Sequence, residues 1–384
     1  MIIIQKKIDC LSIRMEDYMK STYKAALNKV SFIAVFVMCF ILFWGFTLRN
    51  SVFFASSSNT SYITMGQQLA QNGVYAYEST QSNAAVVPAY PVLLSMIFKT
   101  PGANIDAKIN TIKILQLLFS VSAIVFIYLA AKNTFDKIAG IVAALFITFY
   151  PAFVYSWTEL VPTTIFTAVF LFYLAIQLKA IQDSSIVYSM LSGFLFGLAV
   201  LLNPSCIIIG LIPLIYNSIK FHNGFSLKFI GMFLGGFLIP LIPWWIRNII
   251  TLKQFIFLST SFSNEVAIFG QSISNMVASP IDYFNNIISP RFFAIIAHPV
   301  SLNQPFAYLH YIIITLAALG ALYSLKDERI RIITIMAIIA ILQVIFVTGG
   351  VTATQTSEVL YLFPLLIIIA GYMINRVVND VFNI

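Results

Sequence analysis

Charged side chains are scarce in this sequence. Asp, Glu, Lys and Arg make up 9% of the 384 residues, whereas about a quarter of the residues in a soluble domain are charged. Hydrophobic residues make up 60%, and the mean hydropathy is +0.91. Apolar runs of about 17 to 25 residues, long enough to cross the hydrocarbon core of a bilayer, recur along most of the chain. This composition excludes an ordinary soluble protein and predicts an all-α, polytopic transmembrane protein.

Cysteine and histidine are also rare. The three cysteines, Cys10, Cys39 and Cys206, have no metal-ligand spacing, and the last two lie in apolar runs, so we interpret all three as packing residues. Neither His298 nor His310 has another histidine or a carboxylate three or four residues further on. Gly-rich phosphate loops, nucleotide-binding motifs and a Ser/His/Asp pattern are missing as well. The sequence therefore predicts no metal site and no cofactor.

The positive charge follows membrane topology. The formal net charge is +8, but Lys and Arg lie in short clusters between apolar runs, whereas a nucleic-acid-binding protein needs them on one exposed face. With the N-terminus inside, 15 of the 22 Lys and Arg residues fall on the inner side. We therefore expect no nucleic-acid partner, both termini in the cytoplasm, and an integral protein of the cell (inner) membrane that contacts membrane lipids.

The chain divides into a basic cytoplasmic segment (1–30), a transmembrane domain (31–376) and a short cytoplasmic tail (377–384). Hydropathy and the Gly, Pro and charged residues between apolar runs predict about ten spans. They cover residues 31–49, 112–131, 138–156, 162–179, 187–202, 204–218, 228–246, 309–325, 330–348 and 358–375. The short pair around Asn203-Pro204-Ser205 can form one broken helix or two short helices that line a cavity.

The two long connections, at about 50–110 and 249–308, both lie outside, and long loops held between helices are where binding surfaces are usually built. In the first, the spacing of Tyr62, Leu69 and Ala70 predicts a short amphipathic helix, and Asn72-Gly73 indicates its end. Residues 87–98 predict a Pro-opened apolar helix that is too short to span and lies in the membrane interface.

Three positions in or beside these outer segments carry candidate chemistry. Glu159 lies in a tight turn between two apolar spans, where an ionised group is costly, so it is a functional carboxylate or a local cap ahead of Pro162. Arg247 ends a Pro-rich span beside Trp244, where its guanidinium can bind a lipid phosphate or simply extend to the head groups. Asn203 lines a cavity or belongs to a plain Pro-bounded turn.

Several motifs follow one another in a characteristic order. They are Tyr62, Gln71–Tyr75, Pro88–Leu94, Glu159–Pro162, Gly193–Pro204, Pro243–Asn248 and Tyr361–Leu366. With this order, over roughly residues 30 to 376, the chain resembles the polytopic GT-C glycosyltransferases, the superfamily of protein O-mannosyltransferases, aminoarabinose transferases and lipopolysaccharide sugar transferases. The resemblance implies a GT-C-like transmembrane domain whose long first outer loop carries juxtamembrane helices.

The resemblance also implies an activity, namely transfer of a hexosyl or pentosyl group from a polyprenyl-phosphate donor to a lipid, glycan or protein acceptor. Transfer would occur on the outer face, with inversion at the anomeric carbon. In this family an Asp of the first loop acts as the general base, and a cation is needed for the lipid phosphate that leaves. The resemblance implies catalytic roles for Glu159 or Glu78. It implies substrate-binding roles for Arg247, Asn248, Asn203, Tyr62, Tyr90 and Trp244.

Three polar positions depart from the family pattern. Ser57-Ser58-Asn59-Thr60 stands where the Asp is expected, Asn203 stands where Arg commonly precedes Pro, and no Arg-Tyr pair is found around Ser357-Glu358. Two alternatives to an active transferase therefore stay open. One is a catalytically impaired protein of this fold that binds polyprenyl lipid or supports a partner, and the other is a transporter of lipid-linked sugars.

Overall fold

The computed structural model describes residues 33–42, 60–102, 104–150, 156–220, 227–297, 305–346 and 362–382, together with residues 30, 45 and 153. The predictions for residues 1–29, Ser57–Asn59, His298 and Ser357-Glu358 lie outside these residues. Within the described part every regular element is a helix. The helices are residues 33–42, α3 (Thr60–Asn72), α4 (Ala89–Phe98), α5 (Ile105–Thr134), α6 (Lys137–Phe149), α8 (Thr163–Asp183), α9 (Ile186–Val200), η1 (Pro204–Cys206), α10 (Ile207–Lys220), α11 (Leu227–Leu252), α12 (Thr260–Ala278), α13 (Pro280–Tyr283), η2 (Phe284–Ile288), α14 (Ser289–Ala297), α15 (Pro305–Tyr323), α16 (Glu328–Phe346) and α18 (Leu362–Phe382).

Every predicted span overlaps one of these helices, so the all-α transmembrane prediction is confirmed. Five helices in the described part, α5, α8, α11, α16 and α18, are long and apolar enough to cross a bilayer. Residues 33–42, α6, α9, α10 and α15 are apolar but shorter. About ten crossings therefore stay a prediction. The interruption expected at Asn203-Pro204 is present, because α9 ends at Val200 and α10 begins after the 3₁₀ turn η1.

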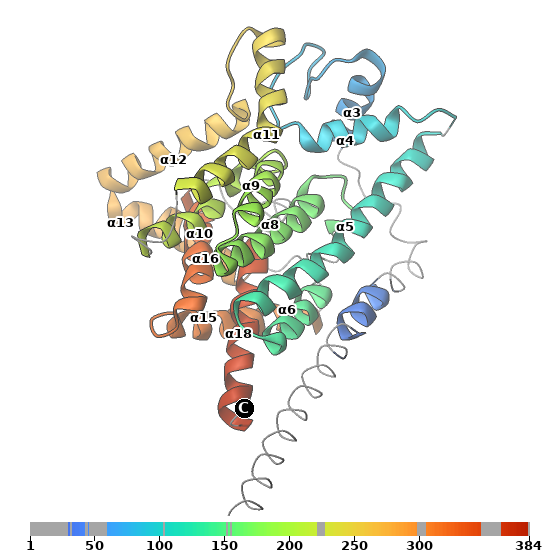
Figure 1. The fold of residues 1–384 in the computed structure, drawn as a ribbon. Coiled ribbons are helices and arrows are strands. Elements are labelled where there is room, and N and C mark those ends of the chain that lie inside the picture. The colour runs from blue at the N-terminus through green and yellow to red at the C-terminus, as the bar shows by residue number, and fades with distance from the viewer. Residues whose placement is uncertain are drawn as a thin grey trace, which may run out of the picture.

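Small residues allow α9 and α11 to pack unusually closely. A Cβ on Gly193 of α9 would lie 2.0 Å from the Phe233 carbonyl oxygen of α11, and one on Gly236 of α11 would lie 2.1 Å from the Met190 carbonyl oxygen. Backbones can approach this closely only where glycine removes the side chain. Figure 1 shows α5, α8, α9 and α11 following one another across the bundle. This packing fixes the position of α11.

Helix α11 continues to Leu252, six residues beyond the predicted end of the seventh span at residue 246. Proline in a helix interior removes an amide donor and usually bends or ends the helix, and α11 contains Pro240 and Pro243. Tertiary contacts outweigh this signal. Trp244 donates its indole N–H to the Leu258 carbonyl at 2.6 Å, so the chain beyond α11 is held back against the helix. Arg247 consequently lies within the last turns of α11.

The first outer connection forms the two predicted short helices, α3 and α4. Gly73, directly after α3, has a φ of +68°, which suits glycine at a helix end. Asn104 caps α5 by accepting a hydrogen bond from the Ala107 amide, so α5 begins at Ile105, within the predicted connection of about 50–110. Figure 1 shows α3 and α4 at the end of the bundle opposite the C-terminus.

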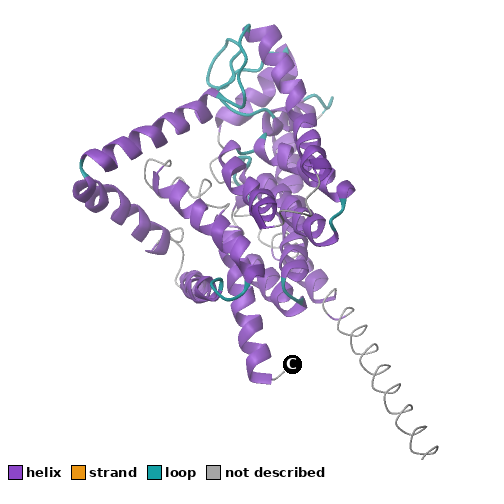
Figure 2. Cartoon of the chain, turned by 60° about the vertical axis from the view of Figure 1, so that its left-hand side comes forward, coloured by secondary structure: helices purple, strands orange, loops and turns teal. Residues whose placement is uncertain are grey.

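The second long connection also contains helices, which the sequence reading did not predict. Ser259 caps α12 by accepting from the Phe262 amide, and α12 then runs away from the bundle before the chain returns through α13, η2 and α14, in a V that Figure 2 shows. Its beginning is joined to the first outer connection, because the Thr260 amide donates to the Ala84 carbonyl at 2.9 Å. The start of α12 thus joins α3 and α4 in one outer layer.

Candidate functional site

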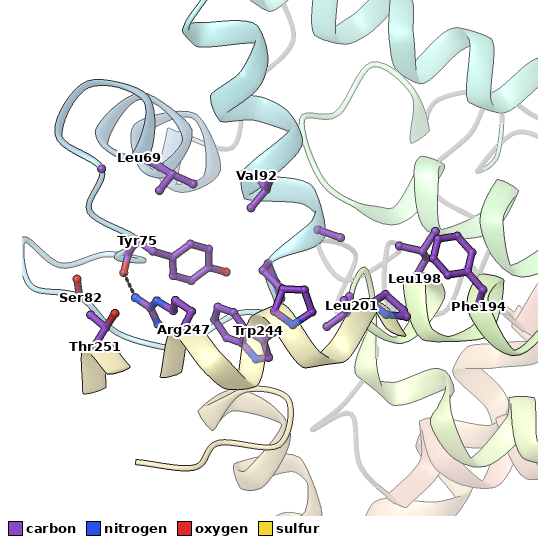
Figure 3. A pocket seen from close by; sticks show the side chains of 15 residues that line it. Leu69, Tyr75, Ser82, Val92, Phe194, Leu198, Leu201, Trp244, Arg247 and Thr251 are labelled. Carbon is purple, nitrogen blue, oxygen red and sulfur yellow. Dashed lines mark hydrogen bonds between the residues drawn. The ribbon is translucent and has the colours of Figure 1, made fainter. Parts of the chain in front are cut away.

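An apolar cavity of about 590 Å³ lies between the first outer connection and the helix pair α9–α11. Its wall comes from α3, the loop after it, α4, α9 and α11 (Figure 3). The lining residues are Leu69, Gly73, Tyr75, Ser82, Pro88, Ala89, Val92, Phe194, Leu198, Leu201, Pro240, Pro243, Trp244, Arg247 and Thr251. Arg247 is the only charged residue among them.

The cavity has a polar end and an apolar end. Figure 3 shows Ser82, Thr251 and Arg247 gathered at one end and Leu198 and Phe194 at the other. Pro240 also lines the cavity, seven residues before Arg247 on α11, which corresponds to about 10 Å along a helix at 1.5 Å per residue. The shape therefore suits an amphiphile with an anionic head at Arg247 and an apolar tail along α11.

Arg247 connects α11 with the loop that follows α3. Its Nη1 donates to the Asn83 carbonyl and to the Asn248 Oδ1, both at 2.9 Å, and its Nη2 donates to the Tyr75 carbonyl at 3.1 Å. The guanidinium carbon also lies 4.8 Å from the centre of the Tyr75 ring and 5.3 Å from that of Trp244. These contacts place a half-buried cation beside two aromatic faces at the polar end of the cavity.

The loop between Tyr75 and Asn83 is a compact turn of its own. The Asn83 amide donates to the Tyr75 carbonyl at 3.0 Å, and the Asn83 side chain exchanges hydrogen bonds with the backbone of Tyr77 at 3.1 and 3.0 Å. Glu78, near the tip, is exposed and has a φ of +50°, a left-handed conformation that is unusual for residues other than glycine. The loop therefore presents Glu78 from a defined backbone.

Glu78 lines a second cavity, of about 580 Å³, together with polar residues of α3. Its Oε1 accepts a hydrogen bond from the Ser61 hydroxyl at 2.9 Å. The neighbouring Tyr77 phenol has a pKa above its ordinary value, first because of burial and then because of the nearby Glu78 charge. A carboxylate has two oxygens, so the bond from Ser61 to one of them is compatible with proton transfer to the other.

Tyr62 and Tyr90 lie inside the layer, and neither lines the apolar cavity. The Tyr62 ring meets Tyr90 edge-on at 5.3 Å between centroids. Tyr90 is 1% exposed and donates its hydroxyl to Gln116 Oε1 at 2.9 Å. Burial raises the pKa of both phenols. The two rings therefore support the layer in this structure.

Glu159 lies at the turn between α6 and α8, and its backbone is bonded to Gln116, the partner of Tyr90. Gln116 Nε2 donates to the carbonyls of Trp157 at 3.0 Å and Glu159 at 2.7 Å. The Glu159 side chain is exposed, but enough protein surrounds its carboxyl group for burial to raise its pKa. It lines neither of the two cavities described above. The structure thus separates Glu159 from the group formed by Arg247, Asn248 and Trp244.

Asn203 contacts the backbone, and Asn248 contacts the Arg247 side chain. Asn203 Oδ1 accepts from the Ser205 amide at 3.1 Å, and Asn203 is not part of the apolar cavity's wall. This contact favours the turn interpretation over the cavity lining. Asn248 is fully buried and orients Arg247 through its Oδ1. Its role in the structure is to position the guanidinium.

Sequence reasoning missed two positions in and around the site. Gln116 and Ser82 lie in segments where no motif marks them, and only the folded arrangement gives Gln116 its three partners on α4 and the 157–159 turn.

No group of three or more His, Cys, Asp or Glu residues that could hold a metal ion occurs in the described part of the chain. Cys39 and Cys206 are buried and unbridged, in agreement with a packing role.

Comparison with known proteins identifies the fold. Residues 87–246 match the family model for dolichyl-phosphate-mannose-protein mannosyltransferase. The structure is similar to that of ArnT from Cupriavidus metallidurans bound to undecaprenyl phosphate, with a TM-score of 0.56 and 14% identity over 92% of this chain and 60% of that one. A search of curated proteins gives no match.

An archaeal enzyme gives a second structural comparison. The oligosaccharyltransferase of Archaeoglobus fulgidus, in the apo form, has a TM-score of 0.54 and 14% identity over 91% of this chain and 50% of that one. The chain therefore spans 60% and 50% of the length of these two proteins. The predicted resemblance to the GT-C superfamily is confirmed, and the structural likeness at this level of identity concerns the fold.

Proposed function

Because the chain is an integral membrane protein with the fold of the GT-C glycosyltransferases, we propose that it transfers a sugar from a polyprenyl phosphate to an acceptor on the outer face of the cell (inner) membrane. The observation that carries this proposal is the position of Arg247 at the polar end of an elongated apolar cavity. That arrangement fits a phosphate head with an isoprenoid tail. An ArnT structure of the same fold is described as bound to undecaprenyl phosphate.

Arg247 has donors for a phosphate in addition to those that hold the loop. A guanidinium has five N–H groups, and the three hydrogen bonds of Arg247 use both on Nη1 and one on Nη2. The remaining Nη2 proton and the Nε proton form a pair with the spacing that phosphate oxygens accept. As the sugar–phosphate bond breaks, negative charge grows on the lipid phosphate, and Arg247 stabilises it.

Glu78 is the carboxylate that the geometry favours as general base. Tyr75, whose carbonyl binds Arg247, lies three residues before Glu78. The Cα atoms of Tyr75 and Glu78 are therefore at most about 11 Å apart. The acceptor hydroxyl attacks the anomeric carbon, the bond to the phosphate oxygen breaks, and the hydroxyl proton passes to Glu78. Glu159 is the second candidate for this proton, since burial raises the pKa of its carboxyl group and so makes its carboxylate a stronger base.

The test measures sugar transfer in vesicles that contain the protein and a panel of undecaprenyl-phosphate sugars. Arg247→Gln is expected to lower kcat/KM by about 10² to 10³, the usual effect of losing one charge-stabilising donor group. Glu78→Gln is expected to lower kcat by about 10² to 10⁴, with little change in lipid binding. If Glu159→Gln abolishes transfer while Glu78→Gln retains it, the base is Glu159. Transfer by neither the wild type nor any variant would favour the catalytically impaired alternative.

A further inference from the structure

Helix α3 separates the two outer cavities. Leu69 and Gly73 line the apolar cavity beside Arg247, whereas Thr64, Gln68 and Gln71 line the second cavity. The spacing of four and three residues places these polar side chains along one stripe of the helix. The following loop is divided in the same way, since it contributes Tyr75 and Ser82 to one cavity and Glu78 to the other. The second cavity therefore lies on the face of α3 that is turned away from the proposed lipid site.

The wall of this second cavity has a chemistry of its own. It is formed by Ser61, Thr64, Met65, Gln67, Gln68, Gln71, Asn72, Ala76, Glu78, Ser79 and Thr80. Eight of these eleven residues carry neutral hydroxyl or amide side chains, which both donate and accept hydrogen bonds. Glu78 is the only charged residue of the wall. Sugar hydroxyls also donate and accept hydrogen bonds, so each of them can pair with a hydroxyl or amide side chain of this wall.

Other ligand classes match it less well. A phosphorylated acceptor would meet the Glu78 carboxylate with no cation in the wall to offset the repulsion. An acyl chain would remove the amides of Gln67 and Gln68 from water without giving them partners, which costs free energy for each group. The wall thus selects for a polar and uncharged molecule.

We propose that this polar cavity, lined by α3 and residues 76–80, binds the acceptor as an uncharged, hydroxyl-rich carbohydrate. The inference rests on the proposed transferase function and specifies its acceptor. The acceptor glycan enters from the aqueous side of α3, and the lipid-linked donor occupies the apolar side. Both cavities are lined by the loop after α3, through Tyr75 and Ser82 on the donor side and Glu78 on the acceptor side. The acceptor hydroxyl therefore meets the donor sugar at this loop, beyond the end of α3, where Glu78 takes its proton.

The test uses the purified full chain in lipid nanodiscs and three neutral trisaccharides, namely maltotriose, cellotriose and chitotriose, observed by saturation-transfer NMR. At least one is expected to bind saturably. Gln71→Trp places a bulky side chain at an exposed position of the wall and is expected to weaken binding at least tenfold. Gln81→Trp is the matched control, because Gln81 is an exposed residue of the same loop that lines neither cavity; its binding should stay within twofold of the wild type.

The same samples are titrated with undecaprenyl phosphate. Arg247→Gln should weaken lipid binding more than trisaccharide binding, because Arg247 lines only the apolar cavity and reaches residues 76–80 indirectly, through the Tyr75 and Asn83 carbonyls. If the lipid binds but none of the trisaccharides does, the acceptor assignment is overturned and the proposed function stands. If a trisaccharide binds in a Gln71→Trp-sensitive manner but the lipid does not, the proposed function fails instead. Binding of glucose 6-phosphate or a Ser/Thr-rich peptide in place of every trisaccharide also overturns the acceptor assignment.

Discussion

Arg247→Lys separates the loop-holding contacts of Arg247 in the structure from its proposed phosphate-binding role. Lysine keeps the positive charge but loses the planar fork, so it cannot bind the Tyr75 and Asn83 carbonyls together. A buried hydrogen bond that involves a charged group contributes about 1.5 to 3 kcal/mol to stability. Since Arg247 is half-buried and water can replace part of each bond, we expect the two losses together to destabilise the loop by about 1.5 to 3 kcal/mol.

This free energy predicts a measurable change in the loop. The Asn83 amide, which donates to the Tyr75 carbonyl, should exchange its hydrogen about 10- to 100-fold faster in Arg247→Lys, because about 1.4 kcal/mol corresponds to a factor of ten. Sugar transfer should fall by about tenfold, less than in Arg247→Gln, because the charge remains. Hydrogen exchange with mass spectrometry and the vesicle transfer assay measure the two effects.

The control for this experiment is Lys253→Gln, which removes a positive charge from the exposed residue that follows α11. Exchange in the loop and sugar transfer should both stay at the wild-type level. Unchanged exchange of the Asn83 amide in Arg247→Lys would refute the loop-holding role of Arg247. Full transfer activity in both Arg247 variants would refute its role as the phosphate site.

Three further changes test the scaffold around the site. Gly193→Ala should lower the stability by about 1 to 3 kcal/mol or more, as expected for overpacking, because its Cβ would lie 2.0 Å from the Phe233 carbonyl oxygen. Gly231→Ala is the control, because the space around Gly231 is open. Equal thermal unfolding of both variants would contradict the close packing. Gln116→Leu removes a donor from the Trp157 and Glu159 carbonyls and should lower Tm and speed exchange in residues 157–161, whereas unchanged exchange would argue against the network. Glu159→Gln should raise Tm at pH 7, because burial raises the pKa of this carboxyl group and its ionisation therefore opposes folding. The gain in Tm should vanish below the ordinary Glu pKa of about 4.3, where the carboxyl group is protonated in both the folded and the unfolded state. A gain in Tm that persists in acid would refute this cause.

The helices could be predicted well because their signals are local. Apolar length, charge clusters and Gly or Pro at helix ends all act within a few residues of where they are read. The continuation of α11 beyond residue 246 was not predicted because the two prolines are a local signal, whereas the Trp244 contact that opposes them comes from Leu258, beyond the end of the helix. The helices of the second outer connection were missed because α12 contains only one charged residue, Glu265, in a mixed polar and apolar sequence.

The site was only partly predictable, for a related reason. Arg247 and Trp244 could be selected from the sequence because arginine and tryptophan have few roles at the end of an apolar span. The hydrogen bonds from Arg247 to Tyr75 and Asn83 could not, since both carbonyls that accept them belong to the backbone, which every residue has. Tyr90 was selected for its side chain, but that side chain bonds to Gln116 in the interior.

In the proposed mechanism, the loop from Tyr75 to Asn83 takes over the task of the Asp expected in the first outer loop. A general base must be placed relative to the leaving phosphate, and a base on a loop is placed only as well as the loop is held. Here Arg247 supplies both the cation for the phosphate and two hydrogen bonds to the loop that carries Glu78. The distance between base and phosphate site is thereby set by one side chain. Loss of Arg247 should consequently impair proton transfer as well as lipid binding, so Arg247→Gln and Glu78→Gln combined should be less damaging than the product of their separate effects.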